Sequence, residues 1–228
     1  IERAVEQGRS IYDNLRKSIL FILPTNGAEG LVIVFAILAG LTLPLTPLQI
    51  LWANMVVGVT LAFALAFERS EPDVMNRPPR PRDAGVLGAA GLVRIVFVTV
   101  VVGTLALVAF AANYQHGEGD LSLARTMTVN ILVFAQAFYL FNVRFLTQSS
   151  LRKELFTTNP VSWLTFGALV ILQVIFSYTP FFNNVFESAP LSWQDWGLTL
   201  LIGVIVFGAV EIEKWVRRLL GRRASMNT

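Results

Sequence analysis

The sequence predicts an all-α membrane protein built as a bundle of six transmembrane helices. Of the 228 residues, 54% are hydrophobic and only 14% are charged, whereas about 25% of an average soluble domain is charged. The hydrophobic residues lie in separate blocks, each long enough for a bilayer core that takes about 20 residues of helix. We place the spans at 19–41, 46–67, 86–112, 124–143, 160–180 and 194–215.

The segments outside these spans are polar. Residues 1–18 alternate charged and apolar side chains with helical periodicity, which predicts a cytoplasmic stalk helix running into the first span. Residues 68–83 contain four prolines and are expected to form a solvated loop. We therefore divide the chain into a stalk helix (1–18), a six-helix part of a transmembrane domain (19–216) and a basic cytoplasmic tail (217–228).

The basic residues predict the orientation, because loops on the cytoplasmic side of a membrane are enriched in Lys and Arg. With the N-terminus in the cytoplasm, 17 of the 18 Lys and Arg residues fall on the cytoplasmic side, and only Arg125 falls outside. Six spans then place both termini in the cytoplasm. The net charge of +3 reflects this topology, and nucleic acid is not expected as a partner. The absence of cysteine excludes disulfides and thiolate metal ligands in this chain.

The first span contains residues that are costly in a membrane, in the run Leu23-Pro24-Thr25-Asn26-Gly27-Ala28-Glu29-Gly30. Pro24 has no N–H, so the carbonyl of Leu20 loses its helical partner, and the helix is expected to be kinked or unwound near Pro24–Glu29. Asn26 and Glu29 are three residues apart and are expected to share a face. A carboxylate, an amide oxygen and a loosened backbone suit a desolvated cation.

Two readings of these polar residues are open. They can be cation ligands, or they can belong to a structural kink whose side chains bond to neighbouring helices. Asn26 fits both, whereas Glu29 favours a functional role because an unpaired buried carboxylate costs several kcal/mol. Asn54 in the second span and Gln136 in the fourth leave the same two readings open.

The remaining polar groups are expected to have structural roles. Asn130 and Asn142 lie toward the ends of the fourth span, where polar residues cost little. Glu211 and Glu213, beside Lys214, Arg217 and Arg218, predict a charge cluster at the membrane interface rather than a site.

Four stretches resemble the type II P-type cation-transporting ATPases, of the calcium-pump-like, bacterial type. Residues 4–17 (AVEQGRSIYDNLRK) resemble the stalk that leaves their phosphorylation domain. Residues 26–29 (NGAE) resemble the cation-binding stretch of their fifth transmembrane helix, and residues 46–54 (TPLQILWAN) resemble their sixth. Residues 71–80 (EPDVMNRPPR) are similar to the cytoplasmic loop that follows. The resemblance implies that this chain supplies helices five to ten of a ten-helix transport domain.

The family couples ATP hydrolysis, through an aspartyl-phosphate, to cation movement. Its phosphorylated aspartate lies in a D-K-T-G-T motif, which does not occur in this sequence. The resemblance therefore implies that ATP and Mg2+ bind to an N-terminal remainder of the same pump, together with helices one to four, and that this chain alone is inactive. The start at Ile1, without a methionine, fits a chain that opens inside a longer protein.

The resemblance also implies ligands. Asn26 and Glu29 match ligands of the sarcoplasmic reticulum calcium pump, Asn54 matches another, and Gln136 falls where that pump has a glutamate ligand. This chain departs from that pump at Val57 and Gly58, where the pump has threonine and an aspartate that bridges two calcium ions. With Glu29 as the single central carboxylate, burial of two divalent ions would leave charge uncompensated. We expect one ion per cycle, Ca2+ or another small cation.

The expected setting is a bacterial plasma membrane, with the lipid bilayer as a partner. Two other functions remain alternatives: a passive channel or secondary carrier that uses the same polar residues, and a regulatory membrane subunit that shares the pump fold.

Overall fold

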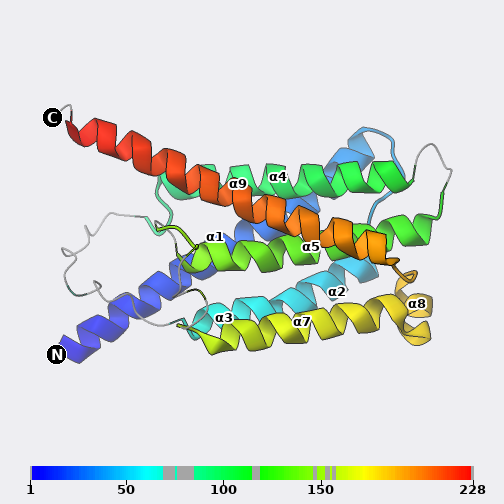
Figure 1. Ribbon diagram of the computed structural model, residues 1–228, viewed down its shortest axis with the longest axis horizontal. Helices are drawn as coiled ribbons and strands as arrows, with labels where there is room; N and C mark the ends of the chain where they lie inside the picture. Colours follow the sequence, from blue (N-terminus) through cyan, green and yellow to red (C-terminus); the bar gives the residue numbers. More distant parts are fainter. Residues whose placement is uncertain are drawn as a thin grey trace.

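A computed structural model describes residues 2–68, 75, 85–114, 119–145, 148–151, 155 and 158–226. Every regular element in these ranges is helical (Figure 1). The elements are α1 (Glu2–Leu38), α2 (Pro47–Val57), the π-helix η1 (Gly58–Ala62), α3 (Phe63–Ala66), α4 (Ala89–Asn113), α5 (Leu121–Arg144), α7 (Pro160–Tyr178), α8 (Pro180–Phe186) and α9 (Trp193–Met226).

Six of these segments are long and apolar enough to cross a membrane. They are Glu2–Leu38, Pro47–Ala66, Ala89–Asn113, Leu121–Arg144, Pro160–Tyr178 and Trp193–Leu219. The second joins α2, η1 and α3 into one span. The predicted all-α fold with six spans is therefore confirmed. Most of the predicted loop at 68–83 falls outside the described residues.

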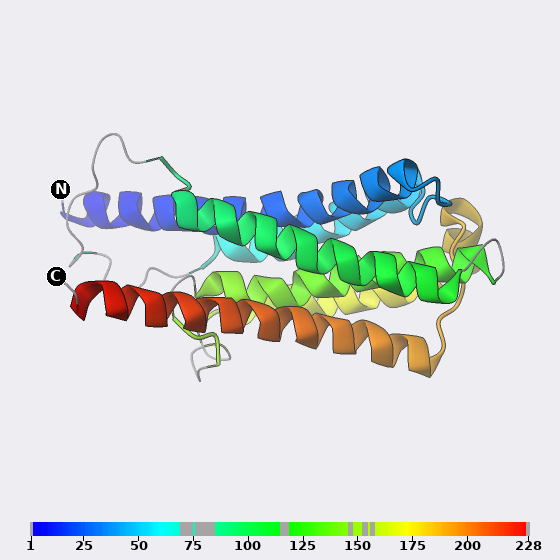
Figure 2. The ribbon, with the colours of Figure 1, turned by 90° about the horizontal axis from the view of Figure 1, so that it is seen from above.

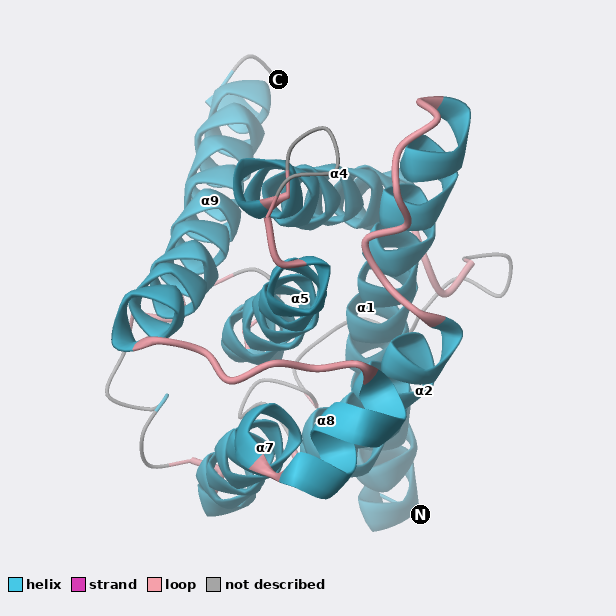
Figure 3. Ribbon diagram, turned by 90° about the vertical axis from the view of Figure 1, so that its right-hand side faces the viewer, coloured by secondary structure: helices cyan, strands magenta, loops and turns pink. Residues whose placement is uncertain are grey.

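Helix α5 forms the centre of the bundle. Figure 3 shows it enclosed by α1, α2, α4, α7 and α9, and it is buried along nearly its whole length. Its apolar residues, such as Leu132, Phe134 and Leu140, supply much of the hydrophobic core. The polar residues Asn130 and Asn142 on the same helix are also fully buried. The expectation that polar residues cost little at these positions is wrong, because neighbouring helices cover α5 at both Asn130 and Asn142.

The stalk and the first span form one helix, α1. Pro24 lies inside this helix, which stays helical through Glu29, so the segment is not unwound. Its two halves run in slightly different directions (Figure 2), as expected for a helix bent at a proline. The carbonyl of Leu20, which Pro24 deprives of its helical partner, accepts a hydrogen bond of 2.8 Å from the hydroxyl of Tyr139. This bond lets α1 continue without opening.

The second span begins at a capping box and is then interrupted. The backbone N–H of Gln49 donates to Thr46 Oγ1 at 3.2 Å, and that of Thr46 donates to Gln49 Oε1 at 3.1 Å. The π-helix η1 starts eleven residues after Pro47, at Gly58. No feature of the sequence predicted it, and π-bulges are frequent at functional sites.

The connection before the last span also differs from expectation. The sequence predicted only a connection between the spans 160–180 and 194–215, but Pro180–Phe186 form the short helix α8. Pro180 occupies its first turn, where the missing N–H costs nothing, and Glu187 ends it in the left-handed conformation at φ 54.

Candidate cation site

Glu29 is the centre of a polar group formed by three helices. Its side chain, on α1, is turned into the bundle and the residue is only 5% exposed. Asn54 on α2 donates from Nδ2 to Glu29 Oε2 at 2.7 Å, and Gln136 on α5 donates from Nε2 to Glu29 Oε1 at 3.3 Å. Each carboxylate oxygen thus has one amide donor. Three of the four predicted ligands therefore lie together.

The two amides can change their role by rotation. An amide carries a carbonyl oxygen opposite its NH2 group, so a half-turn of the Asn54 or Gln136 side-chain amide replaces a donor with an acceptor. In the arrangement described, both amides satisfy a bare carboxylate. With the amides turned, the same group offers a carboxylate and two carbonyl oxygens, which is an oxygen ligand set for a hard cation. Among the described residues, no three His, Asp or Glu side chains form another possible metal site.

Asn26 does not join this group. Its side chain is exposed, whereas Glu29, three residues further on, is buried. The structure therefore separates the two residues that the helical spacing assigned to one face. The role of Asn26 as a ligand stays a prediction.

Val57 and Gly58, the two residues that differ from those of the calcium pump, are not equally buried. Val57 is buried in the core, whereas Gly58 is exposed. A Cβ atom built on Gly58 meets no atom within 4 Å. The beginning of η1 therefore has room for a side chain in the described part of the chain.

Helix α4 approaches α1 closely beside the site. A Cβ atom on Gly27 would lie 2.7 Å from Thr99 Oγ1, and one on Gly103 would lie 2.8 Å from Leu31 Cδ2. A side chain at Gly27 would therefore collide with α4, whereas a Cβ atom on Gly30 would have nothing within 4 Å. The hydroxyl of Thr99 also donates to the carbonyl of Pro24 at 3.3 Å.

Two residues next to the site were missed by the sequence analysis. Neither Tyr139 nor Thr99 was singled out as a candidate. Both hold backbone carbonyls of α1 near Pro24. The available signal was the pairing of a helix-internal proline, which frees a carbonyl, with hydroxyl groups in otherwise apolar spans.

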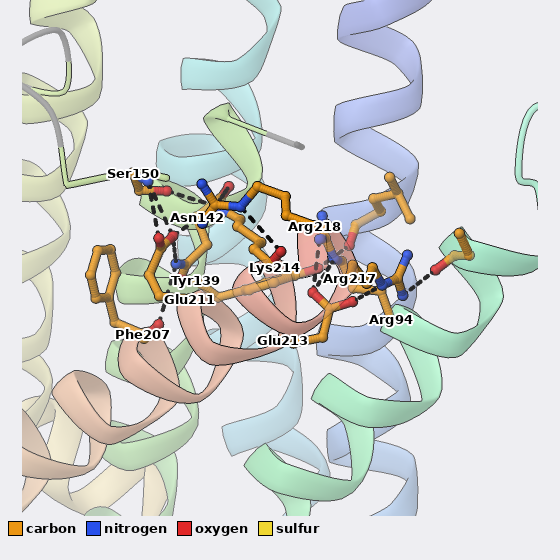
Figure 4. Close-up of polar contacts among 12 residues, drawn as sticks. Arg94, Tyr139, Asn142, Ser150, Phe207, Glu211, Glu213, Lys214, Arg217 and Arg218 are labelled. Carbon is orange, nitrogen blue, oxygen red and sulfur yellow. Dashed lines mark hydrogen bonds and ion pairs between the residues drawn. The ribbon is translucent and has the colours of Figure 1, made fainter. Parts of the chain in front are cut away.

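The charges at the end of α9 are packed between helices rather than spread at a surface. Figure 4 shows Glu211 and Lys214 turned toward α5 and Glu213 turned toward Arg94 of α4. Lys214 is 1% exposed and donates to Glu211 at 2.8 Å, to the Asn142 carbonyl at 2.9 Å and to Ser150 Oγ at 2.8 Å. The predicted charge cluster is present at the end of α9, and its ion pairs also join α9 to the bundle.

Arg94 and Arg144 extend this charged layer. Arg94 donates to Glu213 at 2.8 Å, and Arg217 also pairs with Glu213. Arg144, at the last residue of α5, pairs with Glu68 at 3.0 Å, and Asn159 donates to the same carboxylate oxygen at 2.8 Å. These buried charges are partnered, as buried charges need to be, so they favour a structural role.

Known proteins resemble this chain over most of its length. Residues 42–216 match the family described as "Cation transporting ATPase, C-terminus". The chain is 42% identical over 221 residues to the probable cation-transporting ATPase F of Mycobacterium tuberculosis, an alignment that covers 96% of this chain and 24% of that protein. It is 38% identical over 206 residues to the cation-transporting ATPase pma1 of Synechocystis sp., covering 88% of this chain and 23% of that protein.

A protein named as a calcium transporter is also similar. The chain is 34% identical over 209 residues to the calcium-transporting ATPase of Bacillus subtilis, covering 90% of this chain and 23% of that protein. The chain thus spans about a quarter of the length of these relatives. With the six apolar helices and the family match over most of its residues, this chain belongs to the P-type cation-transporting ATPases, of which it carries the C-terminal membrane part.

Proposed function

We propose that this chain is part of an ATP-driven cation pump and supplies part of its cation site. Glu29 carries the charge, Asn54 and Gln136 contribute neutral oxygens, and Asn26 completes the set from the exposed face of α1. ATP and Mg2+ bind to the N-terminal remainder of the pump, which also covers the exposed side of α1 and α2. Residues 1–18 form the stalk toward that remainder, residues 19–216 the transport part and residues 217–228 a cytoplasmic tail.

The observation that carries this proposal is the meeting of one carboxylate and two amides from three helices. A carboxylate in a membrane span is costly, and such groups usually mark ion pathways. Glu29 accepts hydrogen bonds from two neutral amides, and within the described residues no ion pair joins it to a basic side chain. A transported cation would supply the missing positive charge.

The cation is Ca2+ or another small cation, moved one at a time. A single buried carboxylate compensates one positive charge, and each further uncompensated charge in a low-dielectric region is strongly unfavourable. Equilibrium counting of Ca2+ bound to the purified complete pump checks the ratio, which should be one ion per phosphorylation site. Two ions per site would contradict the one-ion proposal.

Substitution of the carboxylate tests the site itself. In the complete pump, Glu29→Gln should abolish Ca2+-dependent phosphorylation by ATP, because the amide keeps the shape but removes the charge. Glu187→Gln is the matched control, since this carboxylate lies outside the group and is exposed beside Arg125. Normal Ca2+ activation in the Glu29→Gln pump would contradict the site.

The same measurement separates the pump from the other candidates. A passive channel, a secondary carrier or a regulatory subunit would form no cation-dependent phosphoenzyme when joined to its N-terminal remainder. We place the protein in a bacterial plasma membrane, with the lipid bilayer around its apolar helices and both termini in the cytoplasm.

A further inference from the structure

We propose that Tyr139 is a positioning residue for the cation site, because its hydroxyl takes the place of the helical hydrogen bond that Pro24 removes. The inference rests on the proposed function, since the site that Tyr139 positions is the group around Glu29. Tyr139 donates its hydrogen bond to the backbone of α1, whereas Asn54 and Gln136 are the side chains that donate to Glu29.

The position of the hydroxyl matches the position of the defect. In an α-helix, the carbonyl of residue 20 accepts from the N–H of residue 24, and proline has no N–H. The Tyr139 hydroxyl donates to that carbonyl at 2.8 Å. Tyr139 is fully buried, and its ring stacks on Phe21 with centroids 6.1 Å apart and planes inclined by 16°. The ring contact fixes the direction in which the hydroxyl points.

Threonine hydroxyls bind the neighbouring backbone carbonyls around Pro24. The Leu20 carbonyl is the one that depends on Tyr139 for its donor. Thr25 donates to the carbonyls of Phe21 and Ile22 at 3.0 and 2.9 Å, and Thr99 donates to that of Pro24 at 3.3 Å. Without Tyr139, the Leu20 carbonyl would be buried without a donor, and a buried acceptor without a donor is unfavourable. Opening of the helix or entry of water would relieve this and shift the part of α1 that follows.

The contacts of α5 convert that shift into a change at the site. Tyr139 and Gln136 are three residues apart on α5, so they lie on one face. One holds α1 four residues before Pro24, through Leu20, and the other holds it five residues after, through Glu29. The proline bend is thus fixed on both sides by one helix. Loss of the first contact leaves Glu29 free to move relative to Asn54 and Gln136.

A double-mutant cycle tests this role in the complete pump. Tyr139→Phe removes only the hydroxyl, and Pro24→Ala restores the backbone N–H that makes it necessary. Tyr139→Phe should raise the Ca2+ concentration for half-maximal phosphorylation about 3- to 10-fold, the factor that corresponds to one net hydrogen bond. The maximal level of phosphoenzyme should stay unchanged. In the Pro24→Ala background, Tyr139→Phe should raise the Ca2+ concentration for half-maximal phosphorylation by less than about twofold.

A matched control separates this effect from the loss of any tyrosine hydroxyl. Tyr178 also donates to a backbone carbonyl, that of Leu191, at the far end of α7. Tyr178→Phe should leave the half-maximal Ca2+ concentration unchanged. An equal shift by Tyr139→Phe with and without Pro24, or no shift at all, would overturn the inference. If Tyr139→Phe alone fails to accumulate, normal accumulation and activation of the double variant supports it, and failure of both overturns it.

Thermal unfolding of the same four proteins needs no cation. Tyr139→Phe should lower the midpoint temperature with Pro24 present and leave it nearly unchanged with Ala at that position. Equal lowering in both backgrounds would overturn the inference. The Glu29→Gln result judges the cation site separately: if that variant keeps its Ca2+ activation while the thermal cycle shows coupling, the proposed site fails and the hydrogen bond stands.

Discussion

At the scale of single residues, the two amides that face Glu29 are not equivalent. The 2.7 Å distance from Asn54 is typical of a charge-assisted hydrogen bond, whereas the 3.3 Å distance from Gln136 is long. Asn54 also donates to the Ile50 carbonyl at 3.0 Å, which restrains its side chain within its own helix. Asn54 is therefore the better oriented of the two neutral partners.

Alanine substitutions should rank the neutral residues by this geometry. In the complete pump, Asn54→Ala should weaken the apparent Ca2+ affinity by about tenfold, since a hydrogen bond to a charged group contributes about 1.5–3 kcal/mol. Asn26→Ala should have a smaller effect, because Asn26 is exposed, whereas the buried Glu29 carboxylate receives its hydrogen bonds from Asn54 and Gln136. Both should weaken activation less than Glu29→Gln.

The measurement is the Ca2+ dependence of phosphorylation by ATP, with Asn184→Ala in the exposed part of α8 as control. A larger loss for Asn26→Ala than for Asn54→Ala would contradict this ranking and place Asn26 at the centre of the site.

The sequence contained most of the site but not its geometry. Glu29, Asn54 and Gln136, which the structure brings together in one hydrogen-bonded group, could be named from the sequence because polar groups in apolar spans are rare and costly. Asn26 was assigned to the same face because residues three apart are neighbours on a helix. With 3.6 residues per turn, however, Asn26 and Glu29 point about 60° apart around the helix axis. The boundary between the buried and exposed faces of α1 can therefore pass between them. Tyr139 could not be paired with Leu20, because that contact joins residues 119 positions apart.

At the scale of helices, the contact between α1 and α4 depends on glycine at one point. Thr99 lies where the Cβ atom of a larger residue at position 27 would be. Its hydroxyl is also engaged by the Pro24 carbonyl, so it cannot turn away without losing a hydrogen bond. Gly30 lies one turn further along the same helix and has open space at the equivalent position.

These two glycines should therefore respond in opposite ways to alanine. Gly27→Ala should destabilise the protein by about 1–3 kcal/mol, the usual cost of overpacking. Gly30→Ala should be neutral or stabilise it by about 0.5–1 kcal/mol, because alanine loses less entropy in a helix. Thermal unfolding in detergent checks both. Addition of Thr99→Ala to Gly27→Ala should restore part of the loss, and equal effects at the two glycines would refute the close contact.

The long spans could be predicted from the sequence, whereas the π-helix η1 and the short helix α8 could not. The long spans follow from hydrophobic blocks, which the bilayer requires. The π-helix at Gly58–Ala62 adds about one residue per turn within a largely apolar stretch, and no change of pattern marks it. Helix α8 is too short to have a periodic signal, and Pro180 at its start also fits a loop.

At the scale of the whole molecule, the basic residues are distributed unevenly along the bundle. Both termini lie at one end of it (Figure 1). Helix α5 runs from the opposite end, beginning at Leu121, to the end of the termini, where Arg144 is its last residue. Arg125, near its start, pairs with Glu187 at 2.9 Å at the opposite end. This asymmetry agrees with the proposed cytoplasmic position of both termini.

Cysteine labelling from the two sides of the membrane tests this orientation, because the chain contains no cysteine of its own. Asn184→Cys in α8 and Gly117→Cys, which lies outside the described residues, should react with an impermeant reagent added outside. Gly85→Cys should react only from the cytoplasmic side. Asn184 is preferable to its neighbour Asn183, which contacts Ser188. Reaction of each cysteine from the other side would invert the orientation.

The ion pair between Arg94 and Glu213 has a consequence for the synthesis of the protein. The two residues are 119 positions apart, and the carboxylate lies in the second half of the span Trp193–Leu219. When α4 first enters the bilayer, the partner of Arg94 has not yet been translated. Arg94 is the sixth residue of α4, so until then its guanidinium can reach water at the nearby helix end. We expect the packing of α9 against α4 to draw this arginine inward, so that its guanidinium is buried only after α9 is in place.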